Sequence, residues 1–369
     1  MMNKIVFFNA GMQVGGVPRV ISLWSKYFIE KGLEVEIISN IEGELFYDFG
    51  DVKYSVLGID KFKQKSKLKA LYKIYQFLKD RKDEVLIFNK GLYISYLFIL
   101  KKLGLIDKSL KLVYFVHGGS SDFKSMYSNL VNYMINETFD NIIALHNDYE
   151  NFEYKDKTLK RKIINTIFKN QWDNLKQKIV YIPNPVTFRS KKSVDYNQKV
   201  VLAVGRLDKI KGFDLLIKAW EKLANQYDDW RLRIVGSGEE EKNLKNLAKD
   251  IKNIEFIPAQ KDIKKEYLSS SIYVMSSREE GMPMVVIEAM ECGLPIVAFS
   301  NVGAKFLVKD NQNGLLCDVG DIKTLSKNIE KLIKDKNLRE KLGKNSKEMV
   351  KQFYIENLAK NWNIILEKK

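Results

Sequence analysis

Several features that would point to other protein classes are missing from this chain of 369 residues. It has only two cysteines, too few for a disulfide framework, so we expect both to be small buried residues in a reducing compartment. The longest apolar run, residues 92–100, is far shorter than the roughly 20 residues that span a bilayer. The N-terminus also lacks the apolar length of a signal peptide. These absences favour a cytoplasmic protein.

Two motifs that commonly bind phosphate groups or metal ions are also absent. No two aspartates are separated by one residue, so an Asp-x-Asp metal cluster is missing, and no GxxxxGK[ST] loop of nucleoside triphosphatases occurs. Cationic side chains and helix N-termini can neutralise phosphate charge instead. We therefore expect neither a metal ion nor another cofactor.

Acidic residues are outnumbered, since 62 Lys and Arg against 46 Asp and Glu give a net charge of +16. The excess is densest in residues 61–82, where nine Lys or Arg accompany one acid, Asp80. Apolar side chains recur there at helical spacing: Leu68, Leu71, Tyr75 and Leu78. This segment is either a surface helix packed on the core or a basic face that lies on an anionic membrane. Nucleic acid is the weaker choice, because no RNA-binding, zinc or helix-turn-helix pattern appears.

Strand-like runs alternate with helix-like runs along the chain, which predicts an α/β protein with parallel sheets. The expected strands are 5–9, 34–39, 84–89, 111–116, 141–145 and 178–182, followed by 200–204, 231–235, 254–257, 272–275 and 295–298. The best linker candidate combines Pro183-Asn184-Pro185 with the polar residues 189–199. We therefore predict two doubly wound, Rossmann-like domains facing across a cleft, with ligand crevices at the carboxyl ends of the strands.

The most informative segment is residues 280–288, where a Glu-Gly-Met-Pro turn opens a predicted helix. Pro283 suits the first helical turn, where its missing N–H would be unpaired anyway. Eight residues span about 12 Å of helix, so Glu280 lies before the helix N-terminus and Glu288 two turns inside, on nearly the same side. Free N–H groups and the helix dipole favour negative charge at this end. We predict a site for an anionic, hydroxyl-rich ligand.

A pair of cations brackets the loop that follows the predicted strand 200–204. Arg206 offers a planar fork to phosphate oxygens, and Lys211 offers a mobile point charge. Together they suit a diphosphate, especially one that gains charge as it leaves. Lys209 lies between them, and we expect it to be solvated.

Two further loops follow predicted strands in the first half of the chain. Gly15 and Gly16 would let the backbone approach a ligand before a helix that starts near residues 17–18, although such a turn is also common without a ligand. His117 is followed by two glycines, and we expect it to contact a ligand. His146 is equally compatible with packing and with function.

Taken in order, these pieces resemble glycosyltransferase family 4, a group of retaining enzymes with the GT-B fold. The matching segments are Gly15-Gly16, His117-Gly118, Ile182-Pro183-Asn184-Pro185, Gly205-Arg206 with Lys211-Gly212, Gly236-Ser237-Gly238, residues 279–295 and Asn313-Gly314-Leu315-Leu316. The resemblance spans nearly the whole chain and is strongest over residues 200–321. It implies an acceptor-binding domain of residues 1–187 that a crossover helix at 354–369 completes. It also implies a nucleotide-sugar-binding domain of residues 188–353.

The resemblance also implies a role for each matching residue. Glu288 would hold the ribose hydroxyls of the nucleotide, and Glu280 would lie beside the donor sugar. The remaining donor contacts would come from the backbone of Gly281, Met282 and Pro283, from the Gly236 turn on the nucleotide side, and from Arg206 and Lys211 at the diphosphate. Gly15 and Gly16 would approach the phosphates or the acceptor, and His117 would touch the transferred sugar. His146 departs from the small hydroxyl residue usual at its position.

The implied activity is transfer of a hexose or N-acetylhexosamine from a nucleotide sugar, with UDP a commoner carrier than GDP. The acceptor would be a lipid-linked saccharide in surface polysaccharide synthesis, O-antigen or capsule, at the inner face of the plasma membrane. Retention could proceed by double displacement or by front-face substitution, and the latter demands less of the protein.

Two other functions stay open on the residues alone. A sugar-nucleotide epimerase could share this architecture, but it needs acid–base groups around the sugar, and two histidines make that less suitable. A basic, non-catalytic nucleic-acid-binding protein would leave Glu280, Glu288 and the loop cations without a purpose.

Overall fold

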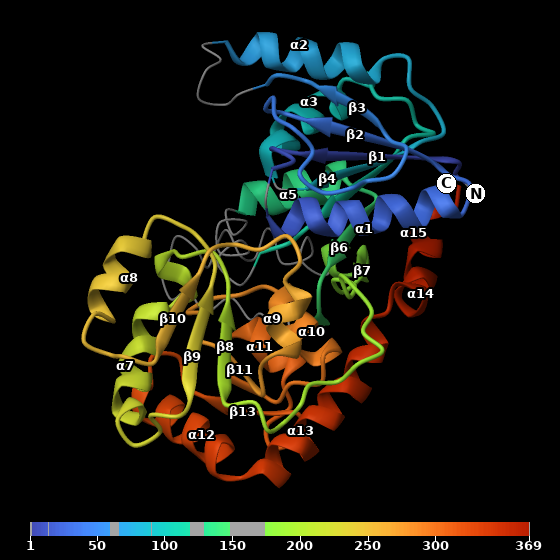
Figure 1. The fold of residues 1–369 in the computed structure, drawn as a ribbon. Helices are drawn as coiled ribbons and strands as arrows, with labels where there is room; N and C mark the ends of the chain where they lie inside the picture. Colours follow the sequence, from blue (N-terminus) through green and yellow to red (C-terminus); the bar gives the residue numbers. More distant parts are fainter. Residues whose placement is uncertain are drawn as a thin grey trace, which may run out of the picture. The chain divides into compact units, whose positions relative to one another are not determined.

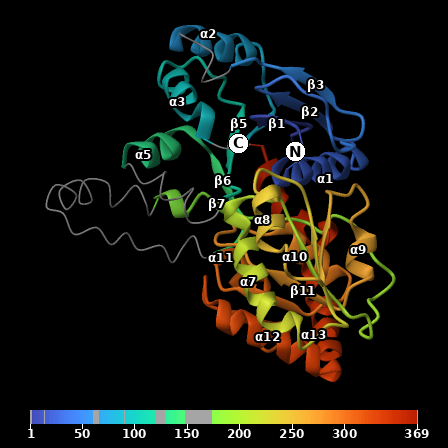
Figure 2. The same cartoon turned by 60° about the vertical axis from the view of Figure 1, so that its left-hand side comes forward.

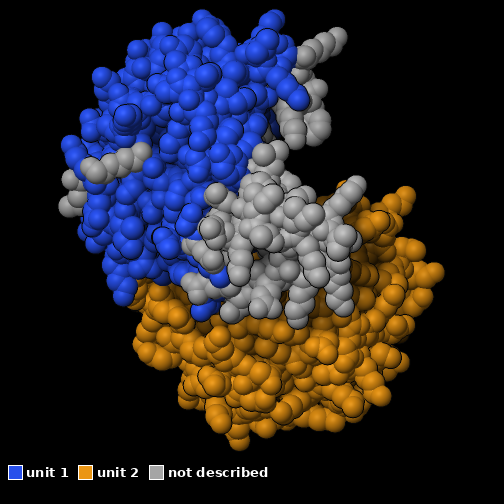
Figure 3. All heavy atoms as spheres, turned by 180° about the vertical axis from the view of Figure 1, so that it is seen from behind, with its two compact units in different colours: residues 1–185, 358–369 blue, residues 186–357 orange. Residues whose placement is uncertain are grey.

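The structure is a computed structural model that describes residues 2–13, 15–59, 66–89, 91–118, 129–147 and 174–368. The chain divides into two compact units, coloured separately in Figure 3. Unit 1 comprises residues 1–185 and 358–369, and unit 2 comprises residues 186–357. In this division residues 186–187 and 354–357 belong to unit 2. Each unit is built around a parallel sheet, which confirms the predicted fold class of two doubly wound α/β domains.

Unit 1 contains a seven-stranded sheet in the order β3-β2-β1-β4-β5-β6-β7, and all of its strand pairs are parallel. The strands are β1 (Lys4–Asn9), β2 (Glu34–Ser39), β3 (Lys53–Val56), β4 (Val85–Asn89), β5 (Lys111–Phe115), β6 (Asn141–Ala144) and β7 (Ile179–Tyr181). Every residue of β4 and β5 is buried, as expected of strands covered on both faces. The sequence interpretation missed β3, because this edge strand has no buried residue and no apolar run.

Helices cover both faces of this sheet (Figures 1 and 2). One face carries α1 (Gly16–Glu30), and the other carries α2 (Lys67–Leu78), α3 (Ile94–Lys102) and α5 (Asn129–Thr138). The chain end packs against α1, since the Trp362 ring lies 5.1 Å from Trp24 and 4.9 Å from Phe28. The expected helix at 354–369 is divided into α14 (Ile355–Leu358), the 3-10 turn η5 (Ala359–Trp362) and α15 (Asn363–Leu366).

The helix α2 buries only part of the predicted stripe: Leu78 is buried and Leu71 and Tyr75 are half-buried, but Leu68 is exposed. Its buried residues are Ala70, Ile74 and Leu78, spaced by four, whereas Leu68 is 76% exposed. Tyr72, one turn further along, is 62% exposed. The small Ala70 side chain lets this face approach the sheet, so Leu68 and Tyr72 are left on the outer face of the helix.

Unit 2 contains a six-stranded parallel sheet in the order β10-β9-β8-β11-β12-β13. Its strands are β8 (Val200–Val204), β9 (Arg231–Val235), β10 (Ile254–Ile257), β11 (Ile272–Met275), β12 (Ile296–Phe299) and β13 (Gly314–Cys317). The sequence analysis did not predict β13, because this strand is only four residues long and directly follows the polar turn at 310–313.

Helices again lie on both faces of the unit 2 sheet. One face carries α7 (Phe213–Ala224), α8 (Glu241–Leu247) and α12 (Ile322–Lys334). The other carries α9 (Lys264–Leu268), α10 (Met284–Glu291) and α11 (Val302–Leu307), and α13 (Lys336–Met349) contacts α10 and α12. Helix α12 begins at an aspartate cap, in which Asp321 accepts a hydrogen bond of 3.0 Å from the Thr324 amide.

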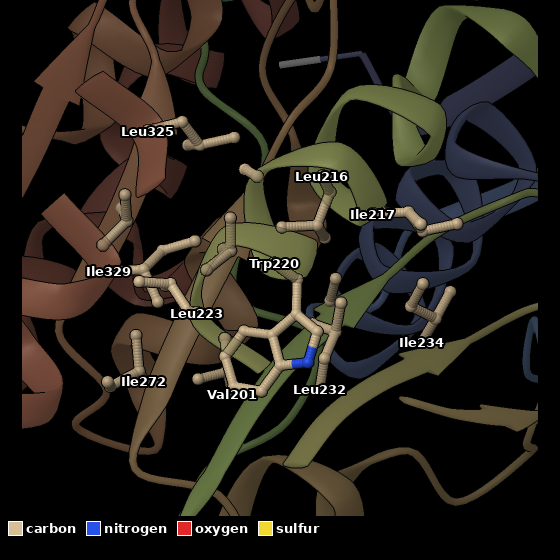
Figure 4. Packing of buried hydrophobic residues seen from close by; sticks show 14 of the residues in the cluster. Val201, Leu216, Ile217, Trp220, Leu223, Leu232, Ile234, Ile272, Leu325 and Ile329 are labelled. Atoms are coloured by element: carbon tan, nitrogen blue, oxygen red, sulfur yellow. The ribbon is translucent and has the colours of Figure 1, made fainter. Parts of the chain in front are cut away.

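The core of unit 2 lies between its sheet and the face formed by α7 and α12. Figure 4 shows Trp220 of α7 among Leu223, Leu232 and Ile329, all of them fully or almost fully buried. The indole Nε1 of Trp220 donates to the Asn253 side chain at 3.1 Å, so its polar atom is satisfied. This core includes residues of β8 and β11 and so holds the strands from which the two loops leave.

The strand order reverses between β1 and β4 in unit 1, and between β8 and β11 in unit 2. In open parallel sheets such reversals are the sites where loops diverge and ligands bind. In unit 2 the loops that leave β8 and β11 therefore lie side by side. Within the described residues, no helix is long and apolar enough to cross a membrane.

Candidate active site

The loop after β8 is organised by the carboxylate of Asp208. One oxygen accepts from the backbone amide of Lys211 at 3.1 Å, and the other accepts from Nε of Arg206 at 2.6 Å. Asp208 is 9% exposed, whereas the Arg206 side chain is 73% exposed. Burial acts to raise the pKa of Asp208, but the hydrogen bonds from Arg206 and the Lys211 amide outweigh it and lower that pKa. Asp208 therefore remains an anion that holds the guanidinium of Arg206.

The loop after β11 is fastened to the loop after β8. The Arg278 amide donates to the carbonyl of Ile210 at 2.7 Å, and the hydroxyl of Ser276 donates to the carbonyl of Lys211 at 3.0 Å. The guanidinium of Arg278 forms two bonds with Asp214, at 2.9 and 2.8 Å. These bonds hold the two loops in a fixed relation across the point of strand reversal.

A glycine makes this close approach possible. Gly212 has a φ of 65°, and a Cβ there would lie 2.1 Å from the carbonyl oxygen of Ser276. Gly236, on the loop after β9, has the same function, because its Cβ would lie 1.9 Å from the carbonyl oxygen of Gly205. The described structure therefore explains Gly236 by loop packing, and its predicted contact with a nucleotide stays a prediction.

The fastened loops bring together two of the predicted catalytic residues. Nζ of Lys211 lies 2.6 Å from Oε1 of Glu280. Both side chains are largely shielded, with 24% of Lys211 and 13% of Glu280 exposed. The cation of the loop after β8 therefore contacts the carboxylate of the loop after β11, at the carboxyl edge of the sheet.

The segment that carries Glu280 is supported from α11. Asn301 caps this helix by accepting from the Ala304 amide at 2.9 Å and also donates to the carbonyl of Ser277 at 2.9 Å. The Gly303 amide donates to the carbonyl of Glu280 at 3.1 Å. A Cβ at Gly303 would lie 2.7 Å from the carbonyl oxygen of Gly281. The sequence interpretation missed both residues, although an asparagine just after a strand and before a helix is a usable capping signal.

The residues that link Glu280 to the next helix are buried. Gly281, Met282 and Pro283 all lie within the protein, and Met282 is 5% exposed. Pro283 has an extended conformation with ψ of 111° and caps the helix, which begins at Met284. The expectation that Pro283 belongs to the first helical turn was therefore wrong by one position.

The second glutamate of the motif, Glu288, lies inside α10 and is 5% exposed. Its Oε1 accepts from the hydroxyl of Thr187 at 2.7 Å, and its Oε2 accepts from the hydroxyl of Tyr267 at 2.8 Å. Burial and the nearby carboxylate raise the pKa of Tyr267 well above its usual value. Burial likewise raises the pKa of Tyr273, and the negative charges of Glu288 and Glu280 both add to this rise.

In unit 1 the expected site residues lie at the carboxyl ends of the central strands. Gly15 caps α1 and Gly16 is its first residue, with no atom within 4 Å of a Cβ built on Gly16. Nε2 of His117 lies 2.6 Å from Oδ1 of Asn89, whose amide donates to the carbonyl of Phe8. Asn89 was missed because asparagine at a strand end carries no motif. His146 is 2% exposed and lies within the packed interior.

In the part of the chain that the structure describes, no group of three or more His, Cys, Asp or Glu side chains is arranged to hold a metal ion. The loop after β8 carries two cations, Arg206 and Lys211, and each contacts a carboxylate.

Solved structures similar to this chain define its class. The match to the structure of TarM covers 100% of this chain and 99% of TarM, with a TM-score of 0.74 at 14% sequence identity. Anabaena HepE in complex with UDP and glucose gives a TM-score of 0.72 at 19% identity, over 99% of this chain and 98% of HepE. At these identities the likeness concerns the fold, which is that of GT-B glycosyltransferases.

Sequence comparison then identifies the family. The profile described as Glycosyl transferases group 1 matches residues 186–349. A Haemophilus influenzae protein described as an uncharacterized glycosyltransferase is 34% identical over 377 residues, covering 99% of this chain and 100% of that protein. The chain belongs to the glycosyltransferases of group 1.

Two further relatives have more specific descriptions. The amylovoran biosynthesis glycosyltransferase AmsD of Erwinia amylovora is 26% identical, over 99% of this chain and 100% of AmsD. A Campylobacter jejuni α-1,4-N-acetylgalactosaminyltransferase, named for an undecaprenol-diphosphate-linked saccharide, is 26% identical over 98% of this chain and 97% of that enzyme.

Proposed function

We propose that this protein is a retaining glycosyltransferase of family 4 that transfers a hexose or N-acetylhexosamine from a nucleotide sugar to a lipid-linked saccharide. The observation that carries the proposal is the contact between Lys211 and Glu280, made by two loops fastened together at the strand reversal of unit 2. A cation there suits the leaving diphosphate, and a carboxylate beside it suits the sugar.

The relatives support the nature of both substrates. HepE was solved with UDP and glucose, and this favours UDP as the carrier. The Campylobacter enzyme is named for an acceptor linked to undecaprenol diphosphate, and AmsD is named for amylovoran biosynthesis. By analogy we assign this chain to bacterial surface polysaccharide biosynthesis, with an acceptor at the cytoplasmic face of the membrane.

In the proposed reaction the acceptor hydroxyl attacks the anomeric carbon on the side from which the diphosphate leaves. The new C–O bond forms as the sugar–phosphate bond breaks, and the departing phosphate oxygen takes the hydroxyl proton. Negative charge grows on the diphosphate, so preorganised cations and N–H groups supply most of the catalysis. We assign this role to Lys211 and Arg206, and the hydrogen bond to Asp208 orients the Arg206 guanidinium. The proposal requires no metal ion.

The remaining predicted contacts are assigned in the same terms. Glu288 binds the ribose hydroxyls, and the backbone of Gly281 to Pro283 with the Gly236 turn lines the donor. From unit 1, His117 contacts the transferred sugar, and Gly15 and Gly16 leave the backbone at the start of α1 open to phosphates or acceptor. The Asn89 side chain fixes the His117 ring.

We further propose that unit 1 associates with an anionic membrane through α2. The outer face of this helix exposes Leu68 and Tyr72, and the exposed lysines Lys69 and Lys79 lie beside them. Apolar side chains flanked by lysines suit insertion between anionic headgroups. Figures 1 and 2 show α2 along the outside of unit 1.

Vesicle sedimentation tests the membrane proposal. We expect binding to phosphatidylglycerol vesicles at low salt, weaker binding at high salt, and little binding to phosphatidylcholine. Leu68→Ser combined with Tyr72→Ser should abolish binding, whereas Leu247→Ser, at a 40% exposed position in unit 2, should not change it. Equal binding to both lipids would contradict the proposal.

A substrate screen tests the enzymatic proposal. Purified protein is incubated with UDP-, GDP- and other nucleotide sugars and a synthetic polyprenyl-diphosphate saccharide, with and without EDTA. We expect release of nucleoside diphosphate and a product with the donor's anomeric configuration, unaffected by EDTA. Isomerised donor in the absence of acceptor would indicate an epimerase instead. Inverted product would contradict the retaining assignment.

A further inference from the structure

We propose that Tyr267 and Thr187 are positioning residues that fix the Glu288 carboxylate to receive the two vicinal hydroxyls of a ribose. This inference rests on the proposed role of Glu288 in donor binding. It adds two residues that lie outside the motif, one on α9 and one at the start of unit 2, and it predicts how the site recognises the sugar of the nucleotide.

The two hydroxyls bind opposite oxygens of the same carboxylate. The hydroxyl of Thr187 donates to Oε1 at 2.7 Å, and that of Tyr267 donates to Oε2 at 2.8 Å. A carboxylate can accept about four hydrogen bonds, two on each oxygen. One bond to each oxygen fixes the plane of the group. A carboxylate held in a fixed plane suits a vicinal diol, which presents two hydroxyls side by side.

The position of Tyr267 is fixed by its packing. Tyr267 is completely buried, and its ring lies 5.8 Å from the buried ring of Tyr273. Its hydroxyl also lies 3.2 Å from the carbonyl of Val285, but the shorter contact with a charged acceptor takes the single proton. A buried tyrosine with a raised pKa stays protonated at neutral pH and so remains a donor.

The consequence is a preference for ribose over 2′-deoxyribose. A carboxylate held in one orientation discriminates strongly between the two sugars, because 2′-deoxyribose offers it one hydroxyl instead of two. A carboxylate free to rotate would lose much of that discrimination. Hydrogen bonds to charged groups are among the stronger ones. We therefore expect the dissociation constant of UDP to be lower than that of 2′-deoxy-UDP by about ten-fold or more.

Isothermal titration calorimetry with UDP and 2′-deoxy-UDP tests the proposal, together with GDP and 2′-deoxy-GDP in case guanine is the preferred base. For Tyr267→Phe and for Thr187→Val we expect weaker binding of the ribonucleotide and little change for the deoxynucleotide. The ratio of the two dissociation constants should fall to about two or three, from the ten-fold or more that hydrogen bonds to a charged group provide. Thr187→Ser retains the hydroxyl and should restore the wild-type ratio.

Tyr273→Phe is the matched control. Tyr273 is also buried and also a tyrosine, but its hydroxyl donates to the carbonyl of Val204 at 3.4 Å rather than to Glu288. We expect Tyr273→Phe to leave the ratio unchanged, with thermal unfolding verifying that every variant is folded.

The outcomes separate this inference from the function on which it depends. If the wild type binds no nucleoside diphosphate, the proposed function fails. If the wild type prefers the ribonucleotide and both Tyr267→Phe and Thr187→Val keep that preference, the positioning role is wrong. Equal weakening of ribo- and deoxynucleotide binding would also overturn it, because that pattern indicates a general structural defect.

Discussion

Replacing Lys211 by methionine removes the ammonium group that contacts Glu280 while keeping a side chain of similar length. Nζ and Oε1 are 2.6 Å apart, and both groups are largely shielded from solvent. The substitution therefore has two effects. It deprives the proposed leaving group of a cation, and it leaves the carboxylate of Glu280 without its partner.

The structure sets a scale for both effects. Two unit charges 4 Å apart attract by about 4 kcal/mol at an effective dielectric constant of about 20. Desolvation and the partial exposure of Lys211 offset most of this attraction, so we expect a loss of about 1–3 kcal/mol in the free energy of unfolding. Loss of one preorganised charge-stabilising group typically lowers the turnover rate by about 10²–10³-fold. The expected effect on catalysis is therefore larger than the effect on stability.

Release of nucleoside diphosphate measures turnover, and denaturant unfolding measures stability. Lys209→Met is the matched control, because Lys209 is an exposed lysine two positions away in the same loop. We expect Lys209→Met to behave like the wild type in both assays. Turnover of Lys211→Met within about three-fold of the wild type would refute the reasoning, since removing such a group should cost about 10²-fold or more. An equal loss in Lys209→Met would show that the effect is not specific to Lys211.

Three further predictions follow from the packing and electrostatics of unit 2. Gly303→Ala should greatly weaken nucleotide binding, because the new Cβ would lie 2.7 Å from a backbone oxygen of the Glu280 segment. Alanine favours helices, so a loss of helix propensity would not explain the effect. Normal nucleotide affinity by calorimetry would contradict this prediction. The pKa of Asp208 is lowered in the folded state, so the stability that it adds is complete above its unfolded pKa of about 3.9 and is lost as pH falls through the folded pKa. Asp208→Asn should therefore be less stable than the wild type at pH 6, with the difference shrinking toward pH 2.5 in denaturant unfolding. Burial raises the pKa of Cys292 and of Cys317 to about 12, so neither should react with iodoacetamide at pH 8 in the native protein, and rapid labelling seen by mass spectrometry would contradict the burial.

The parts of the fold that could be predicted are those that local sequence determines. Strands buried on both faces, such as β4 and β5, read as continuous apolar runs. The edge strand β3 does not, because exposure removes the apolar signal. The phase of α2 was only partly right, because spacing alone could not distinguish the stripe with Leu68 from the stripe with Ala70, and Leu78 belongs to both.

The site divides in the same way. Lys211 and Glu280 belong to recognisable motifs, but their contact is visible only in the structure. Gly303 and Tyr267 lie far from those motifs in sequence and meet them only through tertiary packing, so no local pattern could indicate them. Asp208 lies inside its motif, but its hydrogen bonds to both ends of the loop are visible only in three dimensions.

A crystal structure of the protein with UDP bound tests the central claim most directly. We expect the diphosphate to lie within hydrogen-bonding distance of Lys211 and Arg206, and the ribose hydroxyls to lie on the Glu288 carboxylate. A nucleotide bound away from the loops that follow β8 and β11, or a ribose that does not touch Glu288, would contradict the proposed function.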